Sequence, residues 1–125
     1  MVNGLETVFK ALGEPTRLKI VRLLAEQDLC VCEVVACLDI SQPRASQHLK
    51  ALKKAGIVKE RKVRQKSFYC LDEDIRQGLI AGFAQYMKTD PELLTDLAME
   101  WKRYNDLETN PDVSECAEAR RVFLK

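Results

Sequence analysis

The strongest constraint on the fold is a pair of short amphipathic segments followed directly by a change in hydrophobic period. Residues 32–38 and 43–55 carry apolar residues at helical spacing, and a short turn at 39–42 separates them. Pro43 suits the first turn of a helix, and Gly56 suits the position just beyond its end. The runs at 57–63 and 67–71 resemble strands instead. We therefore predict a helix–turn–helix followed by a β-hairpin with the polar tip 64–66.

The flanking segments complete a mainly α fold class with a small β-hairpin, which is the layout of a winged helix-turn-helix. Helical spacing predicts helices over 4–12, from Pro15 to about residue 24, over 75–88, and from Pro91 to Trp101. We expect one domain over residues 1–103. Residues 104–125 are expected to form a loosely ordered tail, with a short helical piece at most around 115–123.

The charge distribution points to nucleic acid. The formal net charge is only +1, but residues 41–70 hold 9 basic residues and one acidic residue, while the segments on either side are net acidic. A run of like charge is most often just a solvated surface. In a winged helix, however, the second helix of the unit enters the major groove of DNA and the wing flanks the phosphate backbone. We therefore expect double-stranded DNA as a partner.

Two groups of side chains are expected on that interface. Arg, Gln and Ser side chains facing outward from the second helix can read base edges, whereas Lys and Arg side chains of the helix end and wing meet phosphates. The lone histidine, His48, is assigned to DNA contact or to support of the helix rather than to a metal. The candidate DNA-binding residues are Ser41, Gln42, Arg44, Ser46, Gln47, His48, Lys50, Arg64 and Lys66.

Two segments resemble a known family. Residues 41–58, SQPRASQHLKALKKAGIV, closely resemble the helix–turn–helix signature of the ArsR/SmtB metalloregulatory repressors, and residues 9–18, FKALGEPTRL, resemble the opening segment of that family. The resemblance implies a homodimer formed by the first helix and the helix after the wing, whose apolar stripes at 5–12 and 75–87 suit such pairing. It also implies negative control of an efflux or resistance operon, relieved when an effector binds. In such a dimer the two recognition helices lie about one DNA turn apart, which predicts a near-palindromic operator.

The cysteines suggest the class of effector. Five cysteines, with no export signal in residues 1–12, do not indicate a disulfide framework, and no apolar run is long enough to span a membrane. We therefore expect a cytoplasmic protein with no membrane partner. Three cysteines lie within the eight residues 30–37, a spacing that favours soft-ion binding or redox chemistry.

The family's effector types can be compared with this chain one at a time. Residues 73–103 contain no histidine, which excludes the zinc and nickel type, and the absence of cysteine before Cys30 argues against the cadmium and lead type. Residues 29–34, LCVCEV, resemble the arsenic-sensing motif. Cys30 and Cys32 are expected to straddle a helix N-terminus, which lowers the pKa of thiols. The resemblance therefore implies As(III) or Sb(III) as the effector, and no catalytic cofactor.

The third thiolate is the departure from the family's pattern. Val35 stands where the family has its third cysteine, and Cys37 lies five residues after Cys32, about 140° around a helix at 100° per residue. The candidate metal ligands are Cys30, Cys32 and Cys37, with Cys116 or an external thiol as alternatives for the third position.

Two other functions remain open to test. The cysteines could sense oxidants or persulfides instead of a metalloid, or be incidental to a constitutive DNA-binding protein. A thiol enzyme such as an arsenate reductase does not fit, because no phosphate-binding loop follows a cysteine and no histidine stands beside one. No catalytic residues are expected.

Overall fold

The computed structural model describes residues 4–124, which gather into two compact units. The first unit ends at Tyr86 and the second begins at Met87, so the division falls inside the helix Glu73–Lys88. The buried residues of that helix are Ile75 and Gly82, which lie before its last turn. This division differs from the expected domain over residues 1–103 with a separate tail. No helix within residues 4–124 has the length and apolar character needed to cross a membrane.

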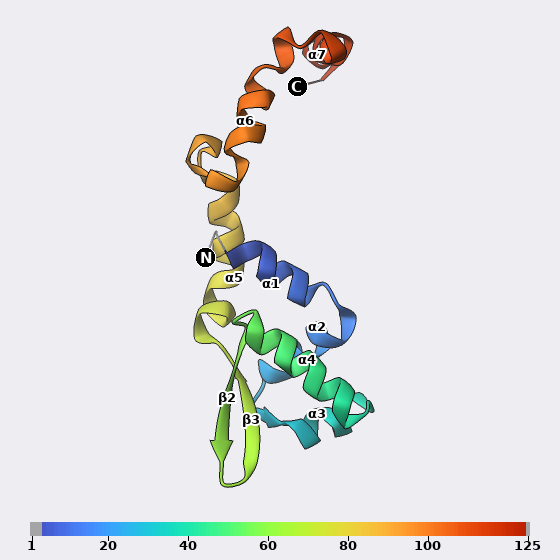
Figure 1. Cartoon of the computed structure of the whole chain (residues 1–125), viewed down its shortest axis with the longest axis vertical. Helices are drawn as coiled ribbons and strands as arrows, with labels where there is room; N and C mark the ends of the chain where they lie inside the picture. Colours follow the sequence, from blue (N-terminus) through green and yellow to red (C-terminus); the bar gives the residue numbers. More distant parts are fainter. Residues whose placement is uncertain (1–3, 125) are drawn as a thin grey trace. The chain divides into compact units, whose positions relative to one another are not determined.

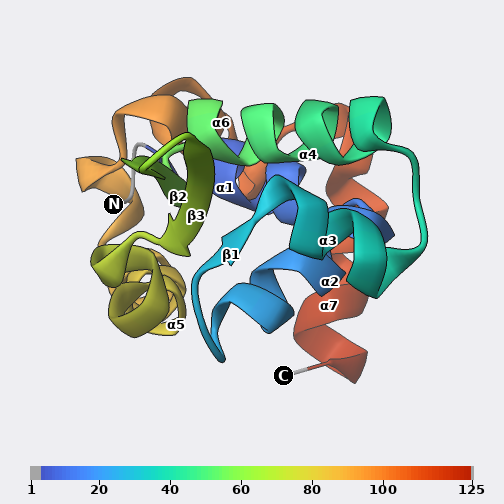
Figure 2. The ribbon, with the colours of Figure 1, turned by 90° about the horizontal axis from the view of Figure 1, so that it is seen from below.

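The first unit has the predicted winged helix-turn-helix layout (Figures 1 and 2). Its elements in chain order are α1 (Leu5–Leu12), α2 (Pro15–Leu24), β1 (Leu29–Cys30), α3 (Val31–Leu38), α4 (Gln42–Lys54), β2 (Val58–Val63), β3 (Lys66–Leu71) and α5 (Glu73–Lys88). The helix–turn–helix is α3 and α4, and the wing is the β2–β3 hairpin. The fold class predicted from the sequence is confirmed.

Local sequence signals explain where α4 begins and ends. The Ser41 hydroxyl accepts a hydrogen bond from the backbone N–H of Arg44 at 3.3 Å, which caps the helix N-terminus. Pro43 follows within the first turn, where its missing N–H costs nothing. Gly56, just past the helix, has φ +77°, in the left-handed region that side chains disfavour. The predicted end of this helix is therefore confirmed.

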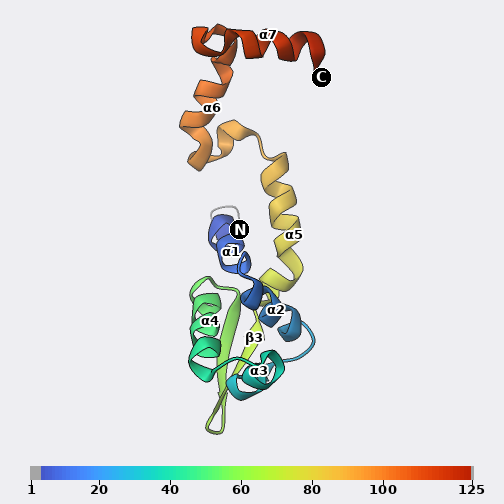
Figure 3. The same cartoon turned by 90° about the vertical axis from the view of Figure 1, so that its right-hand side faces the viewer.

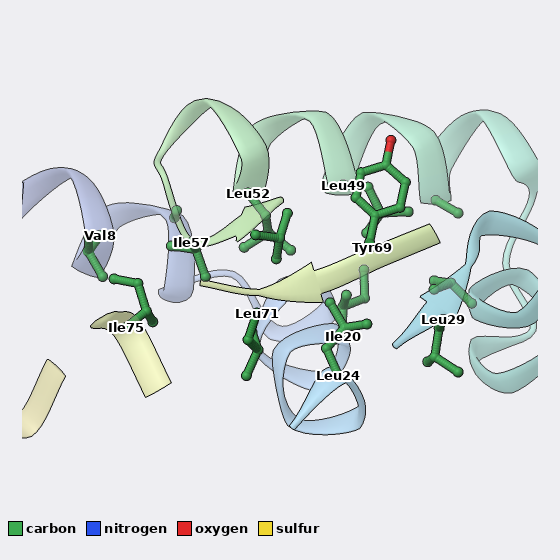
Figure 4. Packing of buried hydrophobic residues seen from close by; sticks show 14 residues of the cluster. Val8, Ile20, Leu24, Leu29, Leu49, Leu52, Ile57, Tyr69, Leu71 and Ile75 are labelled. Carbon is green, nitrogen blue, oxygen red and sulfur yellow. The ribbon is translucent and has the colours of Figure 1, made fainter. Parts of the chain in front are cut away.

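The core of the first unit lies between helices and wing. Ala45, Leu49 and Leu52 of α4 are fully buried, as the spacing predicts. They belong to one cluster with Ile20 and Leu24 of α2 (Figure 4) and with residues of β1, β2, β3 and α5. Burying such a side chain stabilises the fold by about 1.5–3 kcal/mol. One face of α4 is thereby fixed to the core, which leaves its opposite face exposed.

The sheet has one strand that the sequence did not predict. The strand order is β1-β3-β2, with both pairs antiparallel. In the wing, Val63 pairs with Lys66, so the turn consists of Arg64 and Gln65 alone, and Arg64 has φ +60°. The two residues of β1 pair with β3 in the register Leu29↔Tyr69 and Cys30↔Phe68. The cysteine segment is thus joined to the wing by a β-ladder.

The second unit is helical, with short 3-10 turns between its helices. Its elements are η2 (Pro91–Leu93), η3 (Thr95–Leu97), α6 (Ala98–Asn105), η4 (Leu107–Thr109), η5 (Pro111–Val113) and α7 (Ser114–Phe123). The continuous helix predicted from Pro91 to Trp101 is wrong, because Leu94 is extended (φ −91°, ψ 102°) and interrupts it. Within α6 the rings of Trp101 and Tyr104 stack with centroids 4.8 Å apart.

Candidate nucleic-acid interface and thiol site

The face of α4 opposite the core carries the predicted reading residues. Gln42, Arg44, Ser46, Gln47 and Lys50 are all exposed, as is the capping residue Ser41. Arg and Gln side chains can make paired hydrogen bonds to guanine or adenine edges in the major groove. The structure therefore brings together, on one helix face, side chains chemically able to read bases.

His48, one of the candidate DNA-binding residues, is less exposed than the other polar side chains of α4. Its side chain is only 16% exposed, and its Nδ1 lies 3.7 Å from Oε2 of Glu14, which caps α2. A backbone hydrogen bond from Arg17 lowers the pKa of the Glu14 carboxyl below its usual value. His48 lies three residues after the buried Ala45 and therefore near the core-facing side of the helix. Of its two assigned roles, this position suits support of α4 against α2.

The wing presents cations at its tip. Arg64 and Lys66 are exposed on either side of Gln65. Three other basic residues of the block have acidic partners: Lys53 Nζ lies 2.9 Å from Glu60 Oε1, Lys59 Nζ 3.4 Å from Asp72 Oδ2, and Arg61 Nη2 3.7 Å from Asp28 Oδ2. Within residues 4–124, no such ion pair is found for Arg64, Lys66 or the cations of the outward face of α4. These unpaired charges are suited to phosphates.

The Lys53–Glu60 pair links the end of α4 to the wing. Lys53 lies in the last turn of α4 and Glu60 in β2. The hydrogen bond from Lys53, followed by one from Ser67, lowers the pKa of the Glu60 carboxyl, and the same Glu60 contact raises the pKa of Lys53. Both groups therefore stay charged at neutral pH, and Lys53 is held by Glu60 rather than extended as the phosphate contact that the sequence suggested.

Two cysteines meet at the start of α3. Cys30 is the N-cap residue and Cys32 lies in the first turn, so the pair straddles the helix N-terminus as predicted. Their Sγ atoms lie 2.6 Å apart, and both cysteines are free thiols. Cys30 is 5% exposed and Cys32 is exposed. The backbone N–H of Cys30 donates to Glu33 Oε1 at 3.0 Å in a capping box that fixes this turn.

The expected lowering of thiol pKa is wrong for Cys30. Its pKa is raised, first by the hydrogen bond with Cys32 and then by burial, and these effects outweigh the backbone hydrogen bond from Glu33. A buried thiol next to a second sulfur resists ionisation because the charge would be poorly solvated. A soft ion that displaces both protons would remove this cost, since the thiolate is the form that binds metals.

The other three cysteines differ in exposure and position along the chain. Cys37 is exposed on α3, Cys70 is half-buried in β3 with its Sγ 3.8 Å from the Lys59 carbonyl oxygen, and Cys116 is exposed on α7. In the described part of the chain, no three His, Cys, Asp or Glu side chains gather closely enough to hold a metal ion. The structure thus brings together Cys30 and Cys32 and does not bring Cys37 to them.

A cleft of about 240 Å³ lies beside the cysteine pair. The cysteine segment, the first residue of α4, the wing turn and the start of β3 contribute to its walls, which consist of Cys30, Val31, Cys32, Gln42, Gln65, Lys66 and Ser67. Figure 3 shows the helix–turn–helix and the hairpin that supply these residues. Sequence reasoning missed Glu33 in the capping box and Ser67 in this cleft, and it placed Gln65 only at the hairpin tip. The spacing of Glu33 from Cys30 was a signal for the capping box, but no local pattern marked Ser67.

The fold and this outward face define a winged helix-turn-helix DNA-binding protein. Residues 14–60 match the family described as "Bacterial regulatory protein, arsR family". An arsenic resistance transcriptional regulator of Pseudomonas putida is 33% identical over 105 residues, covering 83% of this chain and 82% of that protein. The chain belongs to the ArsR family and is a transcriptional repressor of that family, not an enzyme.

Other relatives agree with this assignment. An uncharacterised HTH-type transcriptional regulator of Methanocaldococcus jannaschii is 52% identical over 68 residues, covering 54% of this chain and 76% of that protein. Among solved structures, a homodimeric winged helix-turn-helix DNA-binding domain of a possible ArsR-family regulator from Mycobacterium bovis superposes with a TM-score of 0.58 at 28% identity, covering 70% of this chain and 83% of that one.

Proposed function

We propose that the protein is an operator-bound repressor released from DNA when trivalent arsenic or antimony binds the thiols of Cys30 and Cys32. The observation that carries the proposal is the position of this pair, with Sγ atoms 2.6 Å apart at the N-terminus of α3, the helix that precedes α4. Soft thiolates suit a soft metalloid. The arsenic resistance regulator of Pseudomonas putida, with its 33% identity, supports the same class of effector.

The bound form on DNA is proposed to be a homodimer acting in the cytoplasm. Phe9 of α1 and Phe83 of α5 contact each other edge-to-face, with centroids 5.5 Å apart, yet both remain partly exposed together with Ile80. These apolar side chains suit an isologous contact between two copies. The homodimeric Mycobacterium bovis domain supports this arrangement. Two copies of α4 would then lie about one DNA turn, roughly 34 Å, apart on a near-palindromic operator.

Release requires only a modest coupling between the two sites. A 100-fold loss of operator affinity corresponds to about 2.7 kcal/mol. Binding one ion between Cys30 and Cys32 changes the first turn of α3, and α3 is joined to α4 by the short segment 39–41. A small rotation of α4 suffices, because base contacts depend on the position of each side chain. The third sulfur is proposed to come from Cys37, with Cys116 or an external thiol as alternatives.

The test is a DNA-binding titration with and without arsenite. A fluorescent duplex selected from a random-sequence pool for tight binding to the wild-type protein serves as operator. Cys32→Ser is expected to bind this duplex normally and to ignore arsenite, because one sulfur of the pair is gone. Cys70→Ser is the matched control, since the Cys70 thiol contacts the Lys59 carbonyl oxygen and does not line the cleft beside the pair, and it should keep the wild-type response. If Cys32→Ser still dissociates at wild-type arsenite concentrations, the thiol sensor is refuted.

An alternative effector is distinguished by the same variants. The short distance between the two sulfurs also suits a redox response, although a disulfide between Cys30 and Cys32 would be strained, so Cys37 would have to take part. Mass spectrometry after arsenite, peroxide or polysulfide separates the two effectors. A metalloid adduct lost in Cys32→Ser supports the proposal. If only an oxidised or persulfidated form of the protein releases DNA, the metalloid proposal is wrong and the protein senses oxidants or persulfides.

A further inference from the structure

The cleft beside the cysteine pair is lined both by the proposed effector-binding thiols and by candidate DNA-contact residues. Cys30 and Cys32 form one wall, and Gln42 and Lys66 form part of the others. Gln42 is the first residue of α4 and Lys66 the first residue of β3, and both are exposed candidates for DNA contact. A volume of about 240 Å³ leaves room for a group attached to the exposed Cys32 sulfur.

The backbone gives this cleft a second connection to the wing. Cys30 pairs with Phe68 in the antiparallel β1–β3 ladder, one residue from Ser67 and two from Lys66. A shift at Cys30 therefore moves β3 directly, without passing through the turn between α3 and α4. The short segment 39–41 is thus one of two routes from the thiols to the DNA-contacting residues.

Lys66 is the wing cation whose side chain is free to turn toward a group bound in the cleft. Its side chain is exposed, and no ion pair within residues 4–124 restrains it, whereas Lys59 and Arg61 of β2 have acidic partners. Arg64 is also exposed and lies in the two-residue wing turn, but it is not among the residues that line this cleft. Both cations therefore belong to the wing, but only Lys66 lines the cleft that contains the thiols.

We propose that Lys66, with Gln42, belongs to both the thiol cleft and the DNA interface, so that a group held at Cys32 competes with DNA for these side chains. Lys66 is then a positioning residue for regulation: it contacts DNA when the cleft is free and turns toward the cleft when Cys32 carries a ligand. This rests on the proposed function for its metalloid ligand, but the competition follows for any group of sufficient size attached at Cys32.

The experiment compares Lys66→Met at the start of β3 with Arg64→Met in the wing turn, two neutralising substitutions two residues apart. The measured quantity is the coupling factor, the ratio of operator Kd with and without arsenite. Both variants should bind DNA more weakly and reduce the slope of log affinity against log salt by about 0.9. Arg64→Met should keep the wild-type coupling factor, whereas Lys66→Met should lower it by at least about twofold, the smallest coupling usual between contacting residues. Equal coupling factors in the two variants would overturn the proposal.

A second measurement needs no metalloid. Iodoacetamide attaches a carboxamidomethyl group to exposed thiols, and at Cys32 this group would enter the cleft. In a Cys37→Ser, Cys116→Ser background, alkylation should weaken operator binding, less so when Lys66→Met is added, and have no effect when Cys32→Ser removes the target. Unchanged DNA affinity after complete alkylation of Cys32 contradicts the shared cleft. If alkylation acts as expected but arsenite does not, the shared cleft stands and the metalloid assignment fails.

Discussion

The substitution Leu49→Ala tests how firmly α4 is held by its buried face. Leu49 is completely buried in the cluster with Ile20 and Leu24. Truncating such a leucine removes its transfer free energy and leaves a cavity, at a cost of about 3–5 kcal/mol. At about 0.05–0.15 kcal/mol per residue, a unit of this size has a total stability on the order of 4–12 kcal/mol. The substitution should therefore remove a large part of the folding free energy.

The assay is urea unfolding followed by far-ultraviolet circular dichroism at one fixed protein concentration, since a dimer's stability depends on concentration. With a slope of about 2 kcal/mol per molar urea, the midpoint should fall by roughly 1.5–2.5 M. Leu18→Ala is the matched control: it makes the same chemical change on α2, at a side chain that is 55% exposed. Its cost should stay below about 1 kcal/mol. Equal shifts for Leu49→Ala and Leu18→Ala would refute the assignment of the core face.

Three further changes probe the ends of α4 and its contact with the wing. Gly56→Ala should destabilise by about 1–2 kcal/mol, measured by the same urea titration, because φ +77° strains any side chain although no neighbouring atom lies within 4 Å of the new methyl group. Ser41→Ala should cost about 1 kcal/mol by losing the cap of α4, and Ser41→Asp should restore the stability. Glu60 has a lowered pKa in the folded protein, so its stabilising effect is present above the unfolded-state value and disappears as the pH falls through the lower folded value. A pH series of thermal midpoints should therefore show a shallower decline below pH 4.5 for Glu60→Gln than for the wild type, and an unchanged decline would count against the Lys53–Glu60 pair.

The parts of the fold that the sequence predicts are those that local chemistry determines. The buried face of α4 follows from apolar residues spaced by four and three, and the cap, proline and glycine signals lie within a few residues of the helix ends. The same reasoning located the pair Cys30 and Cys32 at a helix N-terminus. Each of these features depends on neighbours in the chain, so no knowledge of the folded unit was needed.

The features that the sequence did not predict depend on residues far apart in the chain. Two-residue strands such as β1 have no periodicity, and the pairing of Cys30 with Phe68 exists only after the wing has folded back. His48 lies next to Glu14, 34 positions earlier, and the raised pKa of Cys30 depends on its burial as well as on Cys32. The cleft that joins the thiols to Lys66 likewise combines three separate segments, so no local motif could mark it.

The most direct test of metalloid-controlled repression is the thermodynamic cycle between arsenite and operator. Arsenite affinity is measured on the free protein and on the protein saturated with operator duplex, and operator affinity is measured with and without arsenite. Because linkage is reciprocal, the operator should weaken arsenite binding by the same factor as arsenite weakens operator binding, and Cys32→Ser should bring both factors to one. Equal arsenite affinity for the free and the DNA-bound protein would contradict the account.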